Sequence, residues 1–232
     1  ASGRGGQQTG GEGDVGDAAK HVRTGPVQIS EALTYRSRPL SSMPPVSAPE
    51  GEIEADMLLD RFFRPRTTLA MGQKLYAGVV AQARTPVLYE AYGVPDTVEG
   101  RFELYTAHVF LLLDRLRGQG ARAAETSQAL FDTYIGALDD ALREMGVGDL
   151  SVGKKMRKLG EAFYGRVKSY EAAFAALPQM DHLHALLGRT VYAQGGAENV
   201  GKLADYIIGQ RAHLAGQKLE RLLEGQAEWS AP

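Results

Sequence analysis

Cysteine is absent from this 232-residue chain, and its absence removes several chemistries at once. Without thiols the protein has no disulfide, no thiolate ligand for a metal ion and no cysteine nucleophile. A chain of this kind fits a reducing compartment. Its stability must then come from an apolar core, and 44% hydrophobic residues is enough to build one.

A long apolar run is also missing. The longest strongly apolar stretch covers residues 109–113, whereas about 20 residues are needed to cross a bilayer core of ~30 Å. No secretory apolar segment lies near the N-terminus. We therefore expect a water-soluble chain whose contact with a membrane, if any, is peripheral.

The chain lacks a strong charge of one sign. Its formal net charge is −2, with five basic and eight acidic residues in 1–56 and 21 and 20 in 57–232. Neither part has the basic excess typical of a general nucleic-acid binder, so we expect no DNA partner.

Catalytic patterns are equally scarce. The five histidines include no HxxxH or HExxH pair, and no Ser/His/Asp arrangement follows from local motifs. Asp139 and Asp140 are adjacent, so they do not share a helix face, and neither forms a DxxxD pair with another acid to hold Mg²⁺ and a diphosphate. We expect no enzyme, no metal site and no cofactor.

The stretch GVGDLSVGKK (146–155) resembles a phosphate-binding loop, with Gly148, four residues, Gly153 and Lys154. However, Lys155 stands where that loop needs a Ser or Thr hydroxyl for Mg²⁺. Asp149 adds a negative charge, and the segment before the loop has a helical rather than a strand pattern. The glycines instead predict a turn between two helices, ending one at Gly146 or Gly148.

The first quarter of the chain differs in composition from the rest. Residues 1–16 hold seven glycines, and residues 20–49 are rich in Pro, Ser and Arg. Such a segment buries too little apolar surface to order itself, so we predict that 1–50 is mostly disordered. We divide the chain into a disordered or extension segment, 1–56, and a helical domain, 57–232. Met57 as the native start and a mitochondrial presequence within 20–48 are both open interpretations.

From Met57 onward apolar residues recur every three or four positions, which predicts an all-α fold. A single irregular bundle of about seven helices is expected, with a disordered N-terminal segment. We predict that the helix around residues 109–113 is central, and that Asp96 and Glu99 form the capping box that opens it. The expected helices cover 69–84, a short segment from 86, about 98–116, 123–145, about 149–177, 180–192 and 198–224.

Two features within these helices stand out. Four cations, Lys154, Lys155, Arg157 and Lys158, fall in the first turns of a helix, where the macrodipole disfavours positive charge. They form either a solvated face or a docking patch for an acidic protein, ribosomal RNA or anionic lipid. Gly160 and Gly165 lie inside the same helix, where they either permit the close approach of another helix or mark surface positions.

Two longer segments carry a resemblance to a known family. GVPDTVEGRFELYTAHVFLLLDRL (93–116) and LREMGVGDLSVGKKMRKLGEAFYGRVKSYEAAF (142–174) resemble the ubiquinol–cytochrome c chaperones, assembly factors of the cytochrome bc1 complex. The likeness covers roughly residues 69–210. The sequence departs from the family pattern at residues 105–107, where more aliphatic residues are expected before His108.

The resemblance implies a non-enzymatic assembly chaperone that binds newly made cytochrome b or its nascent chain. It also implies a small helper protein and the ribosome as partners. Arg101, His108, Lys154 and Arg166 occupy motif positions and are candidates for partner contact. Arg101 and Arg166 fit buried pair-forming structural residues equally well. His108 fits either a hydrogen-bonded histidine at the core edge or a contact with a partner or haem.

The resemblance places the protein in a bacterial cytoplasm, at the inner membrane, or on the matrix side if the source is eukaryotic. Two other functions stay open. The first is an adaptor that docks to ribosome or membrane through the patch at 154–158 without a dedicated client. The second is a helical enzyme acting on a prenyl or quinone-like lipid, which is disfavoured because neither Asp139 nor Asp140 forms a DxxxD pair.

Overall fold

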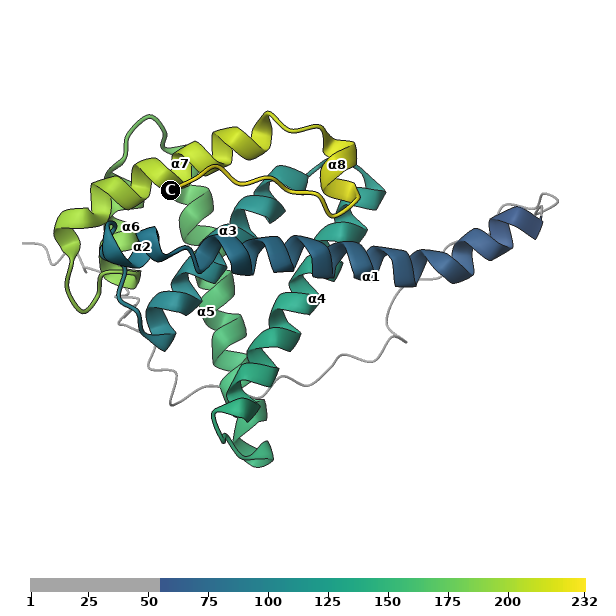
Figure 1. Ribbon diagram of the computed structural model, residues 1–232, viewed down its shortest axis with the longest axis horizontal. Coiled ribbons are helices and arrows are strands. Elements are labelled where there is room, and N and C mark those ends of the chain that lie inside the picture. The colour runs from purple at the N-terminus through teal and green to yellow at the C-terminus, as the bar shows by residue number, and fades with distance from the viewer. Residues whose placement is uncertain (1–54) are drawn as a thin grey trace, which may run out of the picture.

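The structure is a computed structural model that describes the backbone of residues 55–232 and side chains from Thr67 onward (Figure 1). Every regular element in this range is a helix, which confirms the predicted all-α class. The predicted disordered segment lies outside the described residues, up to residue 54. Helix α1 (Ala55–Ala83) runs across the predicted boundary at residue 56, so that division stays a prediction.

Eight α-helices and one 3₁₀ turn follow one another in the described range. After α1 come α2 (Pro86–Glu90), α3 (Val98–Leu116), α4 (Ala121–Glu144), α5 (Asp149–Ala175), α6 (Asp181–Thr190), η3 (Ala197–Asn199), α7 (Val200–Ala215) and α8 (Leu219–Leu223). In Figure 1, α1 lies across the front, α7 and α8 follow one edge, and α4 with α5 projects from the opposite edge.

Helix α3 is the centre of the bundle, as predicted. It packs against α1, α4, α5 and α7, and its residues 109–112 are at most 1% exposed. A helix that is apolar on nearly all sides has this position because only a surrounded helix removes every face from water. The end of α3 near Val98, in contrast, lies at the edge of the bundle.

Helices α4 and α5 form a hairpin through the loop that resembles a phosphate loop. Gly146 has φ +80°, a left-handed conformation that glycine adopts without strain, and α5 begins at Asp149. The segment before it, α4, is a helix, and no strand occurs among residues 55–232. The predicted turn is therefore confirmed.

The closest helix approach occurs at a glycine that the sequence patterns did not single out. A Cβ atom at Gly72 of α1 would lie 2.5 Å from the backbone carbon of Ala129 in α4, so only glycine fits this crossing. Gly160 and Gly165 have open space where a Cβ would stand. Of the two interpretations offered for them, close helix approach is wrong and surface positions are what the structure shows.

The start of α3 corrects the predicted capping box. Thr97, not Asp96, is the N-cap, and its hydroxyl accepts a hydrogen bond from the Gly100 amide at 3.1 Å. The Asp96 carboxylate instead accepts a bond from Arg101. A Cβ on Gly100 would collide with the Pro95 carbonyl oxygen, which explains the glycine within the EGRF motif.

The predicted last helix, 198–224, is wrong in extent, because it divides into η3, α7 and α8. Lys218 has an extended backbone, so the chain turns there and begins α8 anew. The Arg115 guanidinium of α3 donates to the carbonyl oxygens of Leu214 and Gln217, which satisfies groups left open where α7 ends. The local pattern of apolar residues gives no sign of this tertiary contact.

Candidate functional site

The main candidate site is a groove where the start of α3 meets the end of α4. It has a volume of about 300 Å³ and a mostly apolar lining. We call it the apolar groove, and its main residues are Val98, Phe102, Tyr105, Leu138, Leu142 and Met145, with Arg84, Arg101 and Glu144 also lining it. Leu159 of α5 reaches the same groove.

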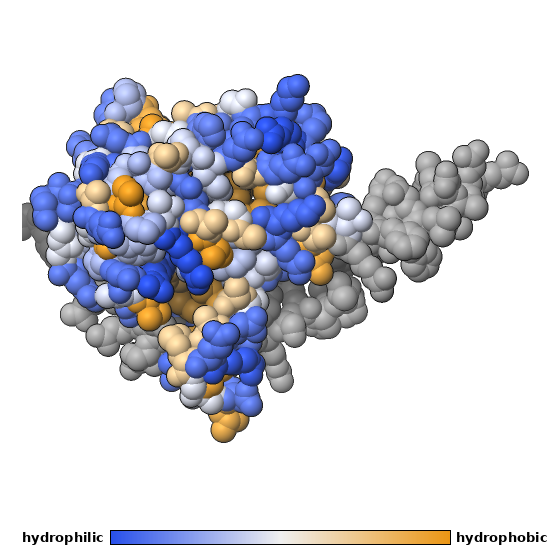
Figure 2. All heavy atoms as spheres, viewed as in Figure 1, coloured by the Kyte–Doolittle hydropathy of each residue, from blue (hydrophilic) through white to orange (hydrophobic). Residues whose placement is uncertain are grey.

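Large apolar side chains stay exposed around this groove. Val98 is 49% exposed and Met145 51%, while Leu150, at the tip of the α4–α5 hairpin, is fully exposed. Figure 2 shows hydrophobic residues gathered over the hairpin and around the hollow where it leaves the body. Apolar surface concentrated beside a hollow is typical of a place that receives another molecule.

Two arginines line the groove where α1 ends and α3 begins. The Arg84 Nε donates to the Tyr105 hydroxyl at 2.8 Å, and the Arg101 Nε donates to the Asp96 carboxylate at 2.6 Å. The hydrogen bond from Arg101 holds the pKa of Asp96 below its ordinary value. Both arginines also line a neighbouring hollow beside α2, of about 680 Å³. They therefore stand between two concave surfaces.

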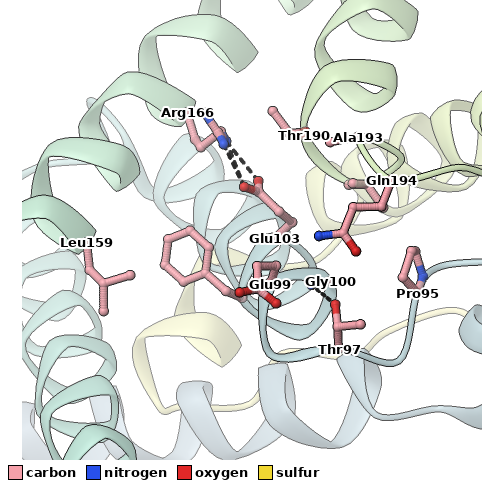
Figure 3. A pocket seen from close by; sticks show the side chains of 12 residues that line it. Pro95, Thr97, Glu99, Gly100, Glu103, Leu159, Arg166, Thr190, Ala193 and Gln194 are labelled. Carbon is pink, nitrogen blue, oxygen red and sulfur yellow. Dashed lines mark hydrogen bonds and ion pairs between the residues drawn. The ribbon is translucent and has the colours of Figure 1, made fainter. Parts of the chain in front are cut away.

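A second, smaller pocket lies beside a buried ion pair (Figure 3). The Arg166 guanidinium of α5 donates to both carboxylate oxygens of Glu103 in α3, at 2.7–3.0 Å. Gln194 and Thr97 are among the other polar residues that line the pocket. Its volume, about 30 Å³, has room for a few water molecules.

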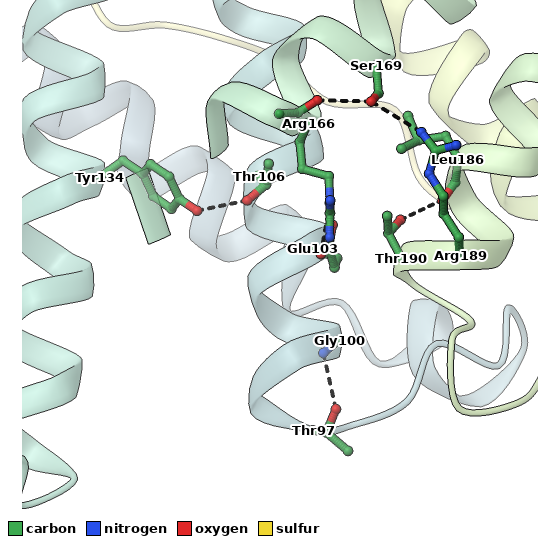
Figure 4. A network of polar contacts seen from close by, with 11 residues as sticks. Thr97, Gly100, Glu103, Thr106, Tyr134, Arg166, Ser169, Leu186, Arg189 and Thr190 are labelled. Carbon is green, nitrogen blue, oxygen red and sulfur yellow. Dashed lines mark hydrogen bonds and ion pairs between the residues drawn. The ribbon is translucent and has the colours of Figure 1, made fainter. Parts of the chain in front are cut away.

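The ion pair belongs to the structural core. Figure 4 shows it between two other buried polar contacts, the Thr106–Tyr134 bond at 2.8 Å and the bond from Thr190 to the Leu186 carbonyl of α6. Each polar group in this row has a partner, which is what burial of polar atoms requires. Arg166 is thus the buried pair-forming residue that one interpretation of the motif expected.

His108 lies in a second buried polar network. Its Nδ1 is 2.7 Å from the Leu104 carbonyl oxygen, which only accepts, so Nδ1 carries the proton. The Nε2 atom then accepts from the Tyr206 hydroxyl at 2.8 Å, and that hydroxyl accepts from the Gln82 amide. Burial lowers the pKa of His108 from 6.5 to about 4. The histidine is therefore neutral at pH 7.

The C-terminal segment covers this network. The Ser230 carbonyl oxygen accepts from Gln82 and from Gln210, and the Trp229 ring meets the His108 ring edge-on at 5.1 Å between centroids. His108 is 1% exposed under this cover. In this arrangement His108 is the hydrogen-bonded histidine that one interpretation expected, and its contact with a partner stays a prediction.

The structure separates the predicted site residues into three places. Arg101 lines the apolar groove, whereas His108 and Arg166 are buried in the core. The four cations at 154–158 lie in the first turns of α5, where Arg157 pairs with Glu161 at 3.1 Å. Lys154 is exposed, and Lys155 and Lys158 are half-buried. The docking role of this patch stays a prediction.

Two absences apply to the described part of the chain alone. Among the described residues, no group of three or more His, Asp or Glu side chains is placed to hold a metal ion. None of the helices described there has both the length and the apolar character needed to cross a membrane.

With this geometry in place, residues 90–229 match the family model described as ubiquinol-cytochrome C chaperone. The chain belongs to this chaperone family, which confirms the resemblance found in the two motif segments. Among curated proteins no significant match was found.

A solved structure extends the comparison. The chain is similar to the crystal structure of the Cbp3 homolog from Brucella abortus, with a TM-score of 0.66 and 32% sequence identity. The alignment covers 75% of this chain and 97% of the other. The fold and the family thus rest on independent comparisons.

Proposed function

We propose that this protein is a non-enzymatic assembly chaperone of the cytochrome bc1 complex, and that its client is newly made cytochrome b. Membership of the ubiquinol–cytochrome c chaperone family and the similarity to the Cbp3 homolog support the class of function. The observation that carries the site is the apolar groove, whose lining residues Val98 and Met145 are about half exposed.

The size of the groove suits a few side chains of a client segment. Its volume, about 300 Å³, is at the lower end of the roughly 300–1,000 Å³ typical of ligand sites. An amphipathic or apolar helix binds such a groove through anchors spaced at i, i+3, i+4 and i+7. Shielding a few anchors would keep an apolar client segment from aggregating until it enters the membrane, while leaving release possible.

The place of action follows as part of the same proposal. A chaperone for a membrane-embedded client works at the cytoplasmic face of the inner membrane, or on the matrix side in a mitochondrion. The basic patch at 154–158 would bring it to the ribosome or to anionic lipid, and a small helper protein would be a further partner. Charge reversal of these four cations should weaken localisation and leave client binding measurable.

The test uses a strain that lacks the gene. The haem b spectrum of dithionite-reduced membranes and the quinol–cytochrome c reductase activity should both fall, and the full chain should restore both. A chain with Val98→Glu and Met145→Glu should restore neither, because two charges would line the apolar groove. The matched control is Leu69→Glu, an exposed apolar residue of α1 outside the groove.

Normal haem b and normal activity in the deletion strain would contradict the assembly function. If the deletion strain is defective but the groove variant restores it fully, the assembly function stands and the groove is not its site. An adaptor without a dedicated client would instead depend on the patch at 154–158 and not on the groove.

A further inference from the structure

The apolar groove carries charges that helix stability does not explain. Arg101 lies in the first turn of α3, where the helix dipole disfavours a cation, and Glu144 is the last residue of α4, where the dipole disfavours an anion. Both residues line the groove, so an explanation is needed in terms of what the groove holds.

The guanidinium groups of Arg84 and Arg101 have donor atoms that can bind an anion in the groove. Arg84 follows the last residue of α1, and within the described side chains its one hydrogen-bond partner is the neutral Tyr105 hydroxyl. That bond uses Nε and leaves the terminal nitrogens of the guanidinium as donors. Arg101 has an exposed partner, Asp96, and an exposed ion pair of this kind is easily exchanged.

Glu144 supplies the opposite charge where α4 ends. From Thr67 to the C-terminus the structure gives this carboxylate no ion-pair partner, although Arg143 beside it is paired with Asp139 and Asp149. The groove thus has one arginine just after α1 and one from α3, an apolar floor, and a carboxylate from α4. This charge distribution complements a segment whose two ends differ in charge.

We infer that the groove selects its client by charge polarity as well as by apolar anchors. This inference rests on the proposed function. The occupant is a helical apolar segment of the client with a carboxylate side chain at the end that faces Arg84 and Arg101, and with a neutral or cationic residue near Glu144. Tyr105 is a positioning residue, since its hydroxyl holds the Arg84 guanidinium beside the groove.

The test measures peptide binding to the full chain by fluorescence anisotropy. One labelled helix-forming peptide has Leu at i, i+3, i+4 and i+7 and Asp in the turn before the first Leu; a second has Asn in place of Asp. The Asp peptide should bind about fivefold more tightly, the size expected for two partly exposed charge contacts. Arg84→Gln with Arg101→Gln should remove the difference, and high salt should reduce it.

The control variant removes the same kind of charge, an arginine, at a position outside the groove. Arg117→Gln alters an exposed arginine that pairs with Glu171 outside the groove, and it should leave the fivefold difference intact. Tyr105→Phe should reduce the preference for the Asp peptide with little effect on the Asn peptide. If Tyr105→Phe weakens the binding of both peptides equally, Tyr105 is not a positioning residue for Arg84.

Three results would overturn the inference. If both peptides bind equally and Val98→Glu with Met145→Glu abolishes both, the groove holds the client but does not select polarity. If that groove variant changes neither peptide, the groove of the proposed function fails as well. If the arginine substitutions lower binding to phosphatidylglycerol vesicles but never discriminate between the peptides, the arginines serve an anionic lipid.

Discussion

The two halves of α3 have opposite surroundings. The second half lies under α7 and the C-terminal segment, and there the His108 ring nitrogens and the Tyr206 hydroxyl all have partners. The first half lines the apolar groove, where Val98 and neighbouring Met145 of α4 remain about half exposed. One helix thus passes from a closed, hydrogen-bonded core to an open apolar surface.

The difference shows that the open end is not a general weakness of packing. The fold covers His108 with an aromatic ring and a hydrogen-bonded tail, yet it leaves apolar residues of the same helix in water. Burying the exposed half of each such side chain would stabilise the protein by about 1 kcal/mol. An uncovered groove beside a well-covered core is what the proposed function requires, because a bound client would complete the apolar contact.

The largest effect on stability should come from the buried ion pair between Glu103 of α3 and Arg166 of α5. Glu103→Gln leaves the Arg166 guanidinium buried beside a neutral amide, and the free energy of unfolding should fall by about 3–5 kcal/mol. Urea denaturation followed by circular dichroism measures the loss. The double variant Glu103→Leu with Arg166→Met should recover most of it, because no unpaired charge remains. A loss below about 1 kcal/mol in Glu103→Gln would show that the pair is not buried as described.

His108 should make the closed half sensitive to acid. Its pKa is about 4 in the folded protein and 6.5 in the ordinary state, so between these values the unfolded chain binds the extra proton. Stability is therefore full above pH 6.5 and decreases as the pH falls toward 4, by about 3 kcal/mol in total from this residue.

Urea titrations from about pH 7 to about pH 4 check the histidine. The His108→Gln variant keeps a donor and an acceptor but does not titrate, so its stability should fall less over the same range. Parallel curves for the variant and the wild type would mean that His108 is not the group responsible.

The α1–α4 crossing should respond more moderately. Gly72→Ala places a Cβ against the Ala129 backbone and should lower the free energy of unfolding by about 1–3 kcal/mol through forced separation of the helices. Gly160→Ala is the matched control, because open space surrounds that position and alanine favours a helix. In thermal denaturation the Tm should be highest for Gly160→Ala, intermediate for the wild type and lowest for Gly72→Ala.

The smallest effect on stability should come from the open half. Val98→Glu and Met145→Glu change exposed side chains, so each should alter the free energy of unfolding by no more than about 0.5 kcal/mol. Denaturant titration at neutral pH is sufficient to detect a larger change. A loss of several kcal/mol would mean that the groove residues support the fold, and the contrast between the two halves would disappear.

The sequence predicted the helices well where the apolar period was long. The central position of residues 109–113 and the turn at Gly146 follow from periodicity and glycine chemistry, and both are confirmed. The division of the last helix was missed, since it depends on Arg115 reaching across from α3. Local patterns contain no information about such a tertiary partner.

The candidate site was less accessible to sequence reasoning. Arg101 was named, but Arg84, Val98 and Met145 come from separate helices, and only the fold brings them to one groove. A further sequence signal was the departure from the family pattern that begins at Tyr105, whose hydroxyl accepts a hydrogen bond from Arg84. The sequence did not single out Gly72 for the same reason, because the need for a glycine there depends on where α4 crosses α1.

The most direct test of the central claim is site-specific photo-crosslinking from the groove in growing cells. A photoreactive phenylalanine analogue at Met145 should crosslink to newly made cytochrome b, identified by mass spectrometry, whereas the same analogue at Leu69 should not. A crosslink from Met145 that disappears when cytochrome b synthesis is blocked would support the account. Cytochrome b captured equally from both positions, or from neither, would contradict the groove as the client site.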